Sequence, residues 1–487
     1  MIVHTVETAE ARLEPEAFFA RARVLLESGR LVTFYGGPGG AADTRSLTAV
    51  FAVAGRIEVL RSTVARGRGF HALTPEHACV HVFEREVHER WDVEPRGHPW
   101  LKPVRFSGSR LGETASYPFY RVEGKEVHEV GVGPIHAGVI EPGHFRFMCL
   151  GERVHHLEIQ LGYQHRGVED LLLRGAPWSL GPLVETIAGD TSVGHAWAYS
   201  AALEALAGVS PSRALGLARG VGLELERVAM HLATLSGLFA DIAHLQGAST
   251  YGRLRTTIIN ATMRSCGSRF GRGWVRPGSH RVDLGPHARA ALRRDLGAVR
   301  RDVAIVDELV RDARGVAHRL QGVGVVTTDV AARMGFVGTV ARSCGIPLDA
   351  RAAVDAQEPY RELRPSVAVE PAGDCRARAI VRMREIQASL DWVEAALECG
   401  VEATEPATRT PSPLAPGRIS VAMVEGVRGE VVHVLETDDA GALRAYRAQD
   451  PSLRNWFALA LAVRDEEIYD FPICNKSFDL SYCGHDL

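Results

Sequence analysis

The sequence predicts an α+β fold, in which a small N-terminal α+β domain precedes a mainly helical bundle domain with peripheral β hairpins. Short apolar runs separated by Gly and Pro fill residues 1–110 and indicate strands. Several long segments after residue 130 carry apolar residues at helical spacing. Long helices with short connections typically pack as a bundle. We therefore expect domains at 1–110 and 130–487, with a linker at 111–129.

The N-terminal domain begins with a helix over residues 14–28, followed by strands at 31–35 and 48–53. The glycine-rich segment at 36–40 lacks the Lys and Ser/Thr of a phosphate-binding loop, so we interpret it as a connection. Glu84 and His88 are spaced i,i+4 on a predicted helix face, which favours a surface ion pair over a metal site. A Pro/Gly-rich stretch at 103–125 indicates the linker.

The second domain opens with strands at 143–150 and 154–161, separated by a turn at 151–152. Four helices are predicted at residues 186–207, 212–246, 285–320 and 373–397. Residues 403–416 form a Pro-rich loop, and a hairpin follows with strands at 418–424 and 430–435.

The composition limits the function classes. Of 487 residues, 46% are hydrophobic and 24% charged, which is typical of a globular chain with a sizeable core. Lys and Arg (56) nearly balance Asp and Glu (59), and a net charge of -3 argues against a nucleic-acid binder held by bulk positive charge. We expect no secretory signal and no membrane span. Eight scattered cysteines without CxxC favour a reducing compartment, with most thiols buried.

Ionisable residues gather among apolar ones in three places: residues 152–169, residues 185–195, and the C-terminal residues 479–486. Buried carboxylates and imidazoles have perturbed pKa values and suit proton relays, although solvated or paired structural groups account for most residues in such clusters. HExxH, GxSxG and Walker motifs are absent. The residues alone therefore predict polar groups in the core and no metal site.

The sequence also resembles a known protein family. Residues 78–106, with FEREVHE at 83–89 and GHP at 97–99, resemble the 30 kDa subunit of complex I. The rest resembles its 49 kDa subunit and the large subunit of group 4 membrane-bound [NiFe] hydrogenases, and the fused order resembles the formate hydrogenlyase large subunit. The matching motifs are GPIH at 133–136, LGYQHRGVE at 161–169, HAWAY at 195–199, ELER at 224–227, WVRPG at 274–278, GVGVV at 322–326, DPSLRNW at 450–456 and KSFD at 476–479.

The chain differs from the hydrogenases at the residues that bind the metal. In that family two CxxC motifs supply four thiolates to the Ni–Fe centre. The corresponding positions hold Ala188, Thr191, Ser481 and Gly484, and Cys483 is one place out of register. Because a Ni–Fe centre needs soft thiolate ligands, the resemblance implies that this chain binds no metal and no cofactor of its own and performs no hydrogen chemistry.

In the 49 kDa subunit the vacated space holds a quinone headgroup. His136 matches the first histidine of that family's pattern, but the second falls at Ile140 and the headgroup-binding tyrosine falls at Leu183. Nearby polar residues such as Glu141, His144, Asp190 and Thr191 could replace them. The residues that the resemblance and the polar clusters assign to proton or electron chemistry are His136, Glu141, His165, Glu169 and Asp190.

Three hypotheses follow. The first is a large core subunit of a membrane-associated oxidoreductase complex, which passes electrons from a [4Fe–4S] cluster in a partner small subunit to a quinone or another acceptor and couples this to proton movement. It would lie peripherally on the cytoplasmic side, against integral antiporter-like subunits. The second is a non-catalytic scaffold that keeps the fold and its partner contacts. The four missing cysteines argue against the third, an active hydrogenase.

Overall fold

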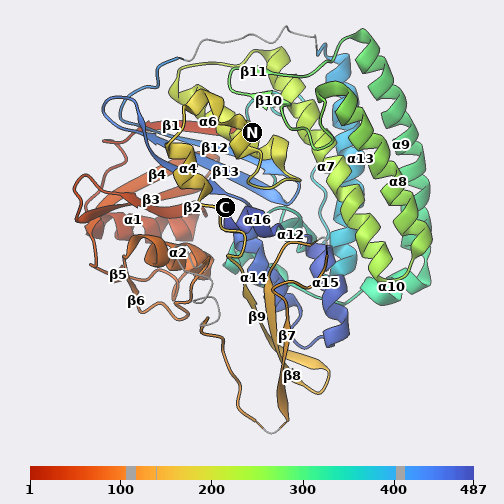
Figure 1. The fold of residues 1–487 in the computed structure, drawn as a ribbon, viewed down its shortest axis with the longest axis horizontal. Coiled ribbons are helices and arrows are strands. Elements are labelled where there is room, and N and C mark those ends of the chain that lie inside the picture. The colour runs from red at the N-terminus through yellow and green to blue at the C-terminus, as the bar shows by residue number, and fades with distance from the viewer. Residues whose placement is uncertain (106–116, 125, 139, 402–411) are drawn as a thin grey trace.

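The computed structural model describes residues 1–105, 117–124, 126–138, 140–401 and 412–487. An α+β unit lies at one end of the molecule, a helical bundle at the other, and a sheet between them (Figure 1). The predicted fold class is confirmed by this mixture of small sheets and a bundle. The boundaries at 110 and 130 stay a prediction, and residues 106–116, 125 and 402–411 of the predicted linker and loop lie outside the described residues.

The N-terminal unit is an antiparallel sheet of order β2-β3-β4, which packs against helices α1 and α2. The predicted helix and both strands are confirmed. The elements are α1 (Pro15–Ser28), β2 (Arg30–Pro38), β3 (Thr44–Val53), β4 (Arg56–Ala65), the short pair β5 (Phe70–His71) and β6 (Pro95–Arg96), η1 (Ala78–Val80) and α2 (His81–Trp91). Strand β2 extends into the glycine segment, where a Cβ on Gly36 would lie 2.5 Å from Cδ1 of Trp91. Glycine therefore allows α2 to approach the sheet.

The predicted surface ion pair between Glu84 and His88 is wrong. Glu84 is fully buried, and its carboxylate accepts hydrogen bonds from the backbone N–H of Leu73 (2.6 Å) and Thr74 (3.2 Å) and from the Thr74 hydroxyl (2.6 Å). A charged residue on a helix therefore turned inward, because backbone donors of the preceding loop satisfy it.

The central sheet has the order β1-β12-β13-β14, and all its pairs are antiparallel. Its strands are β1 (Ile2–Glu7), β12 (Arg418–Gly426), β13 (Gly429–Thr437) and β14 (Leu443–Gln449). The predicted hairpin at 418–435 is confirmed, but β13 is buried throughout its length and β12 nearly so, so this hairpin is central rather than peripheral. Strand β1 pairs with β12 from Ile2↔Met423 to Glu7↔Arg418, a pairing that the sequence pattern does not indicate.

The N-terminal sheet and the central sheet pack face to face. Val32 and Val50 of the N-terminal sheet share one apolar cluster with Val421 and Val434 of the central sheet. The N-terminal unit is thereby fixed against the body of the protein by burial of apolar surface.

The bundle consists of four long helices that lie side by side: α7 (Arg213–Asp241), α8 (Leu245–Cys266), α9 (Pro286–Asp312) and α13 (Cys375–Glu398) (Figure 1). The single helix predicted at 212–246 ends at Asp241, because Ala243 has φ 58° and the His244 ring accepts from the backbone N–H of Gly247 to begin α8. The helix predicted at 285–320 is broken at Ala313, whose backbone is extended, and continues as α10 (Arg314–Leu320). Helix α8 itself was not predicted.

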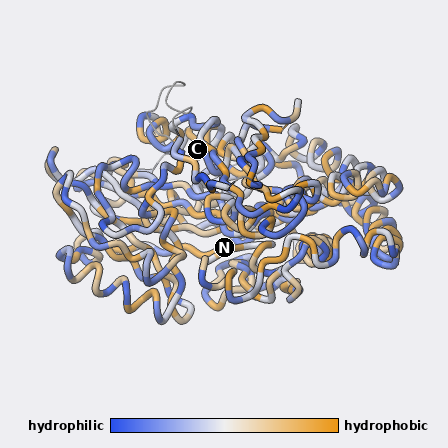
Figure 2. The backbone as a smooth tube through the Cα atoms, turned by 90° about the horizontal axis from the view of Figure 1, so that it is seen from below, coloured by the Kyte–Doolittle hydropathy of each residue, from blue (hydrophilic) through white to orange (hydrophobic). Residues whose placement is uncertain are grey.

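The remaining elements surround these layers. A sheet of β7 (Val127–Val132), β8 (His144–Leu150) and β9 (Arg153–Gln160) extends away from the body, and β8 and β9 confirm the two predicted strands. The others are α4 (Val168–Leu173), η2 (Pro177–Ser179), α5 (Gly181–Val184), α6 (Ser192–Leu206), β10 (Val275–Arg276), β11 (Ser279–His280), α11 (Thr328–Met334), α12 (Gly338–Ser343), α14 (Ser452–Ala462), η3 (Ile468–Asp470), α15 (Phe471–Phe478) and α16 (Tyr482–Asp486). Polar and apolar residues interleave along the chain (Figure 2), and within the described ranges no helix is long and apolar enough to cross a membrane.

Candidate functional site

The first two vacated ligand positions precede helix α6. Ala188 is buried in the loop, and Thr191 lies directly before the first helical residue. The helix predicted from residue 186 begins only at Ser192, because the Glu226 carboxylate of α7 accepts from the backbone N–H of Val193 (2.7 Å) and Gly194 (3.2 Å). These are the free donors at a helix start, so Glu226 fixes where α6 begins.

The other two positions lie in the C-terminal tail. The Ser481 hydroxyl accepts from the backbone N–H of Gly484 (3.0 Å) and so caps α16. A Cβ at Gly484 would lie 2.6 Å from Cγ of Asp450. The tail is therefore closely packed, and position 484 has no room for a side chain.

Arg166 joins these two segments. Its guanidinium donates to the carbonyls of Thr186 (2.6 Å) and Ile187 (3.1 Å) before α6, and to the carbonyl of Cys483 (2.9 Å) in the tail. The segments that carry all four vacated positions are therefore neighbours in the fold.

Arg428 occupies the space between them. It projects from the turn between β12 and β13, donates to both oxygens of Asp190 (2.9 and 2.6 Å), and lies 3.7 Å from the Asp479 carboxylate. Its side chain also reaches the Thr191 hydroxyl (3.4 Å). Burial opposes the charge of Arg428, but the two carboxylates outweigh it and raise its pKa.

These residues do not fit a Ni–Fe centre. The four positions offer a methyl group, two hydroxyls and a bare backbone instead of thiolates, and the Ser481 hydroxyl already caps a helix. Cys483 is the thiol nearest in sequence, but burial and the charge of Glu141 raise its pKa to about 11, so it stays protonated at neutral pH. A soft metal would find no thiolate at these positions.

A chain of buried hydrogen bonds runs inward from the tail. The Tyr446 hydroxyl donates to Nδ1 of His433 (2.8 Å), Nε2 of His433 faces Nδ1 of His195 (3.0 Å), and Nε2 of His195 faces Oδ2 of Asp450 (3.2 Å). A carboxylate at one end and a phenol at the other give every link one donor and one acceptor when both imidazoles are neutral. This arrangement can pass a proton between the tail at Gly484 and the sheet interior.

Burial lowers the pKa of His433 well below its usual value, and the neighbouring His195 lowers it further, so His433 is neutral. Burial alone would raise the pKa of Asp450, but its hydrogen bond with His195 and the nearby charge of Arg428 lower it. In this chain of hydrogen bonds Asp450 therefore carries a negative charge and His433 is neutral.

Glu226 is a buried acidic group whose pKa is strongly raised. Burial, with a smaller contribution from Asp190, raises its pKa from 4.5 to about 8. It lines a small pocket together with Asp190, Val193 and Phe270, on the side of the Asp190 loop that faces α7 and α8. A protonated carboxyl group therefore lies beside Asp190 at neutral pH.

Glu226→Gln should change the pH dependence of stability. Between about pH 4.5 and about pH 8 the folded protein binds one more proton than the unfolded chain, so the wild type loses stability as pH rises through this range. Glutamine keeps one of the two acceptor oxygens and removes the titration. Relative to the wild type, the variant should gain a few kcal/mol between about pH 5 and about pH 8, measured by urea unfolding. Parallel pH profiles of the two proteins would contradict the assignment.

The predicted site residues separate into two groups. Glu141 accepts from the backbone N–H of Cys483 (3.1 Å), and the Tyr482 hydroxyl lies 3.4 Å from Nε2 of His136. Nδ1 of His165 donates to the carbonyl of Asp486 (2.8 Å). All three side chains contact the C-terminal tail, whereas Asp190 reaches it through Arg428.

Glu169 does not belong to the group around the C-terminal tail. It accepts from the backbone N–H of Ala448 (2.9 Å) and forms ion pairs with Arg90 of α2 and with Arg447. It therefore ties α4 to the N-terminal unit and to β14. Leu183 is half-buried in α5, and Ile140 is 48% exposed beside the Glu141 loop. Neither side chain can hydrogen-bond a quinone carbonyl.

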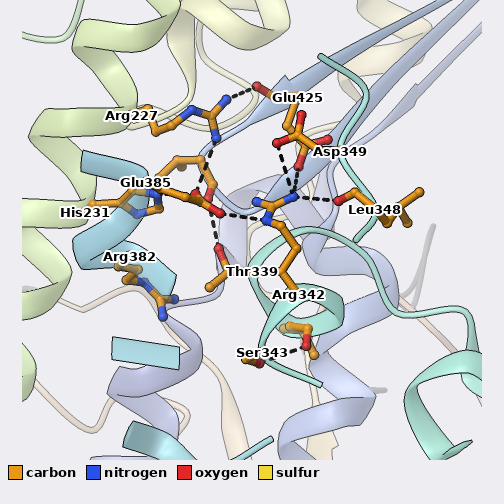
Figure 3. Close-up of polar contacts among 12 residues, drawn as sticks. Arg227, His231, Thr339, Arg342, Ser343, Leu348, Asp349, Arg382, Glu385 and Glu425 are labelled. Carbon is orange, nitrogen blue, oxygen red and sulfur yellow. Dashed lines mark hydrogen bonds and ion pairs between the residues drawn. The ribbon is translucent and has the colours of Figure 1, made fainter. Parts of the chain in front are cut away.

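A buried ionic network adjoins the site (Figure 3). Arg342 of α12 donates to Glu385 of α13 (2.6 Å) and to Glu425 of β12 (2.7 Å), and Glu385 also contacts His231 of α7 (2.7 Å). Arg227 of α7 donates to the backbone carbonyl of Glu425. This network joins the bundle to the strand that leads into the Arg428 turn.

Several residues of the site were not predicted as functional, namely Arg428, His433, Asp450, Glu226 and Tyr446. His433 lies among valines in a strand, and Arg428 lies in a hairpin turn. Asp450 belongs to a matching motif that gives it no role of its own. A charged or imidazole residue inside an apolar strand is an available signal, since such groups are buried only with partners.

Comparisons with known proteins agree with this architecture. Residues 241–410 match the family model described as the respiratory-chain NADH dehydrogenase 49 Kd subunit. The chain is 24% identical to hydrogenase-4 component G of Escherichia coli, over 87% of this chain and 76% of that protein. It is 29% identical to the membrane-bound hydrogenase subunit alpha of Pyrococcus furiosus, over 72% and 85%.

It is also 30% identical to an NADH-quinone oxidoreductase subunit of Ehrlichia ruminantium, over 51% of this chain and 63% of that protein. Among solved structures, a chain of the membrane-bound sulfane sulfur reductase, an archaeal respiratory membrane complex, has the same fold, with a TM-score of 0.70 and 22% identity over 76% of this chain and all of that one. The 30 kDa-like identity of residues 1–110 stays a prediction. Residues 241–410 therefore match the 49 Kd subunit family, and the chain is similar to subunits of NADH-quinone oxidoreductase and of membrane-bound hydrogenases.

Proposed function

We propose that this chain is the large core subunit of a membrane-associated redox complex whose electron acceptor is not a Ni–Fe centre. Electrons arrive from a [4Fe–4S] cluster in a separate small subunit and reduce a quinone or another small acceptor near the Asp190 loop and the C-terminal tail. The complex includes integral antiporter-like subunits, and this chain lies peripherally on the cytoplasmic side. The relationship to large subunits of membrane complexes supports this assignment.

One observation carries the proposal. The Asp190 loop and the residue 481–484 tail meet without thiolates, while Glu141, Glu226 and the His195–Asp450 pair surround them. Adding an electron to a low-dielectric site is costly unless a proton follows. Proton carriers at the meeting point of the two segments are what acceptor reduction requires, and their reorganisation on reduction can couple to proton movement in membrane partners.

A non-catalytic scaffold is the second candidate function, and Arg428 favours it. Its guanidinium fills the space beside Thr191 and is held by both oxygens of Asp190. An acceptor must displace this pair or bind next to it. If neither happens, the residues maintain only the fold and the partner contacts.

The test uses the complex purified from its natural host through a tag on this chain. We expect nickel far below one atom per chain, and a lipid extract that contains quinone if quinone is the acceptor. Asp190→Asn should lower the rate of acceptor reduction by about tenfold or more while subunit composition stays intact, since removal of one proton carrier typically costs about 10²–10⁴-fold in rate. The matched control is Asp329→Asn, which changes an exposed ion pair with Arg333 on α11.

The outcomes separate the alternatives. Nickel near one atom per chain would overturn the proposal in favour of a hydrogenase. An assembled complex that transfers electrons equally well with Asp190→Asn and with Asp329→Asn would favour the scaffold.

A further inference from the structure

Two of the cysteines come together away from the site. Cys375 is the first residue of the long helix α13, Cys474 lies in α15, and both are fully buried. An added Cβ at Gly324 would lie 2.7 Å from Sγ of Cys474 and 3.4 Å from Sγ of Cys375. Both sulfur atoms therefore pack against the same point of the backbone, and neither forms a disulfide in this structure.

Neighbouring donors, among them Arg378 and Cys474, point at the sulfur of Cys375. Nη2 of Arg378 lies 3.3 Å from it, and the Cys474 thiol forms a hydrogen bond with it. Cys375 also lies at the N-terminal end of a 24-residue helix, where the helix dipole favours a negative charge. All three influences stabilise a thiolate at Cys375 rather than at Cys474.

Arg378 supplies an independent reason for a thiolate. Its side chain is fully buried, and its other contacts are neutral: the carbonyls of Gly373 (2.7 Å) and Gly324 (2.9 Å), the Ser477 hydroxyl (2.8 Å) and the ring of Phe478. Within the described part of the chain, no ion pair of 4.0 Å or less involves this guanidinium, and the Glu466 carboxylate acts on it only from a greater distance. A buried cation without a counter-charge in direct contact is costly. The Cys375 thiolate is the anion that the geometry provides.

The surrounding groups shift the pKa values of the two thiols in opposite directions. Burial alone would raise the pKa of Cys375, but the hydrogen bond from Cys474 and the charge of Arg378 lower it to about 6. The hydrogen bond to Cys375 raises the pKa of Cys474, as do burial and the nearby Glu466, whose carboxylate accepts from the backbone N–H of Gly324 (2.8 Å). At neutral pH one sulfur is therefore a nucleophile and its neighbour keeps a proton.

We propose that Cys375 and Cys474 form a redox-active dithiol, which a low-molecular-weight disulfide converts to an intramolecular disulfide during local openings that expose the two buried sulfurs. The Cys375 thiolate attacks one sulfur of the oxidant RSSR and releases RS⁻, which leaves a mixed disulfide. Cys474 then loses its proton, attacks Sγ of Cys375 and releases the second RS⁻, which takes up that proton. In total, the thiolate, the thiol and RSSR give one protein disulfide, one RS⁻ and one RSH.

The oxidised form would have two consequences. The disulfide would link the start of α13 to α15, the helix that ends one residue before Asp479 of the candidate site. It would also remove the negative charge beside Arg378. This inference rests on the two thiols and Arg378 alone, so it stands or fails independently of the proposed electron-transfer function.

The test equilibrates the full-length protein in glutathione buffers of increasing oxidised fraction, then alkylates free thiols, digests the protein and analyses the peptides by mass spectrometry without reduction. We expect a cross-linked peptide pair joining Cys375 to Cys474. Cys474→Ala should retain glutathione on Cys375, because no second thiol resolves the mixed disulfide. The matched control Cys399→Ala, at a half-buried thiol elsewhere, should behave as the wild type.

Wild-type protein in which both thiols remain free, or pair with other cysteines, in the most oxidising buffer would overturn the proposal. A second measurement requires no variant. At neutral pH, iodoacetamide should alkylate Cys375 about tenfold or more faster than Cys344, another buried thiol, whose pKa burial raises. Equal rates at the two thiols would likewise overturn it.

Discussion

Arg342→Leu should lower the free energy of unfolding by about 3–5 kcal/mol, the usual cost of removing one partner from a buried ion pair. Arg342 is fully buried and neutralises Glu385 and Glu425, which are each 1% exposed (Figure 3). Leucine has a similar volume but no charge, so two carboxylates would lose their shared counter-ion. Urea unfolding followed by circular dichroism measures the effect.

A matched control exists on the surface. Arg333→Leu makes the same substitution in an exposed i,i+4 pair with Asp329, whose side chains are 68% and 73% exposed. Such pairs contribute about 1 kcal/mol or less. Losses of similar size in the two variants would show that burial of the Arg342 network is not what makes it stabilising.

Gly338→Ala should be the most disruptive single-methyl change near the candidate site. Gly338 has φ +63°, and a Cβ there would lie 2.0 Å from the backbone carbonyl of Arg428. Left-handed strain costs about 1–2 kcal/mol and overpacking about 1–3 kcal/mol, so we expect a loss of about 2–5 kcal/mol in unfolding free energy. Because the turn that carries Arg428 must shift, its contact with Asp190 should also weaken.

Gly315→Ala provides the comparison. Gly315 lies in α10, and apart from its neighbours in the helix no atom of the described residues lies within 4 Å of its added Cβ. Alanine is a better helix former than glycine, so this variant should be unchanged or more stable by about 0.5–1 kcal/mol. If both alanine variants unfold at the wild-type urea concentration, the close approach between α12 and the β12–β13 turn is not rigid.

Local patterns predicted the elements whose boundaries are set locally. The helix at Pro15–Ser28 and the hairpin at 418–435 follow from apolar periodicity and turn residues. The end of α7 and the start of α6 could not be found this way. The first depends on a left-handed residue at Ala243, and the second on Glu226, which lies 33 residues away in sequence from the amide that it caps.

The residues of the candidate site divide in the same way, into those that the sequence could locate and those that only the fold brings there. Family motifs located Asp190, Thr191 and Ser481 by alignment alone. Arg428 and His433 come from a hairpin more than 200 residues away from the α6 loop, and only the packed fold brings them to it. Periodicity also misjudged Glu84, because a charged residue on a helix is assigned to solvent unless its backbone donors are known.

The pairing of β1 with β12 has a consequence for biosynthesis. Ile2 lies opposite Met423, so strand β1 must wait for about four hundred further residues before its partner is made. During that interval its hydrogen-bonding edge is unsatisfied and open to wrong partners. Closure of the central sheet therefore follows the synthesis of strand β12, and until then strand β1 needs protection from wrong partners.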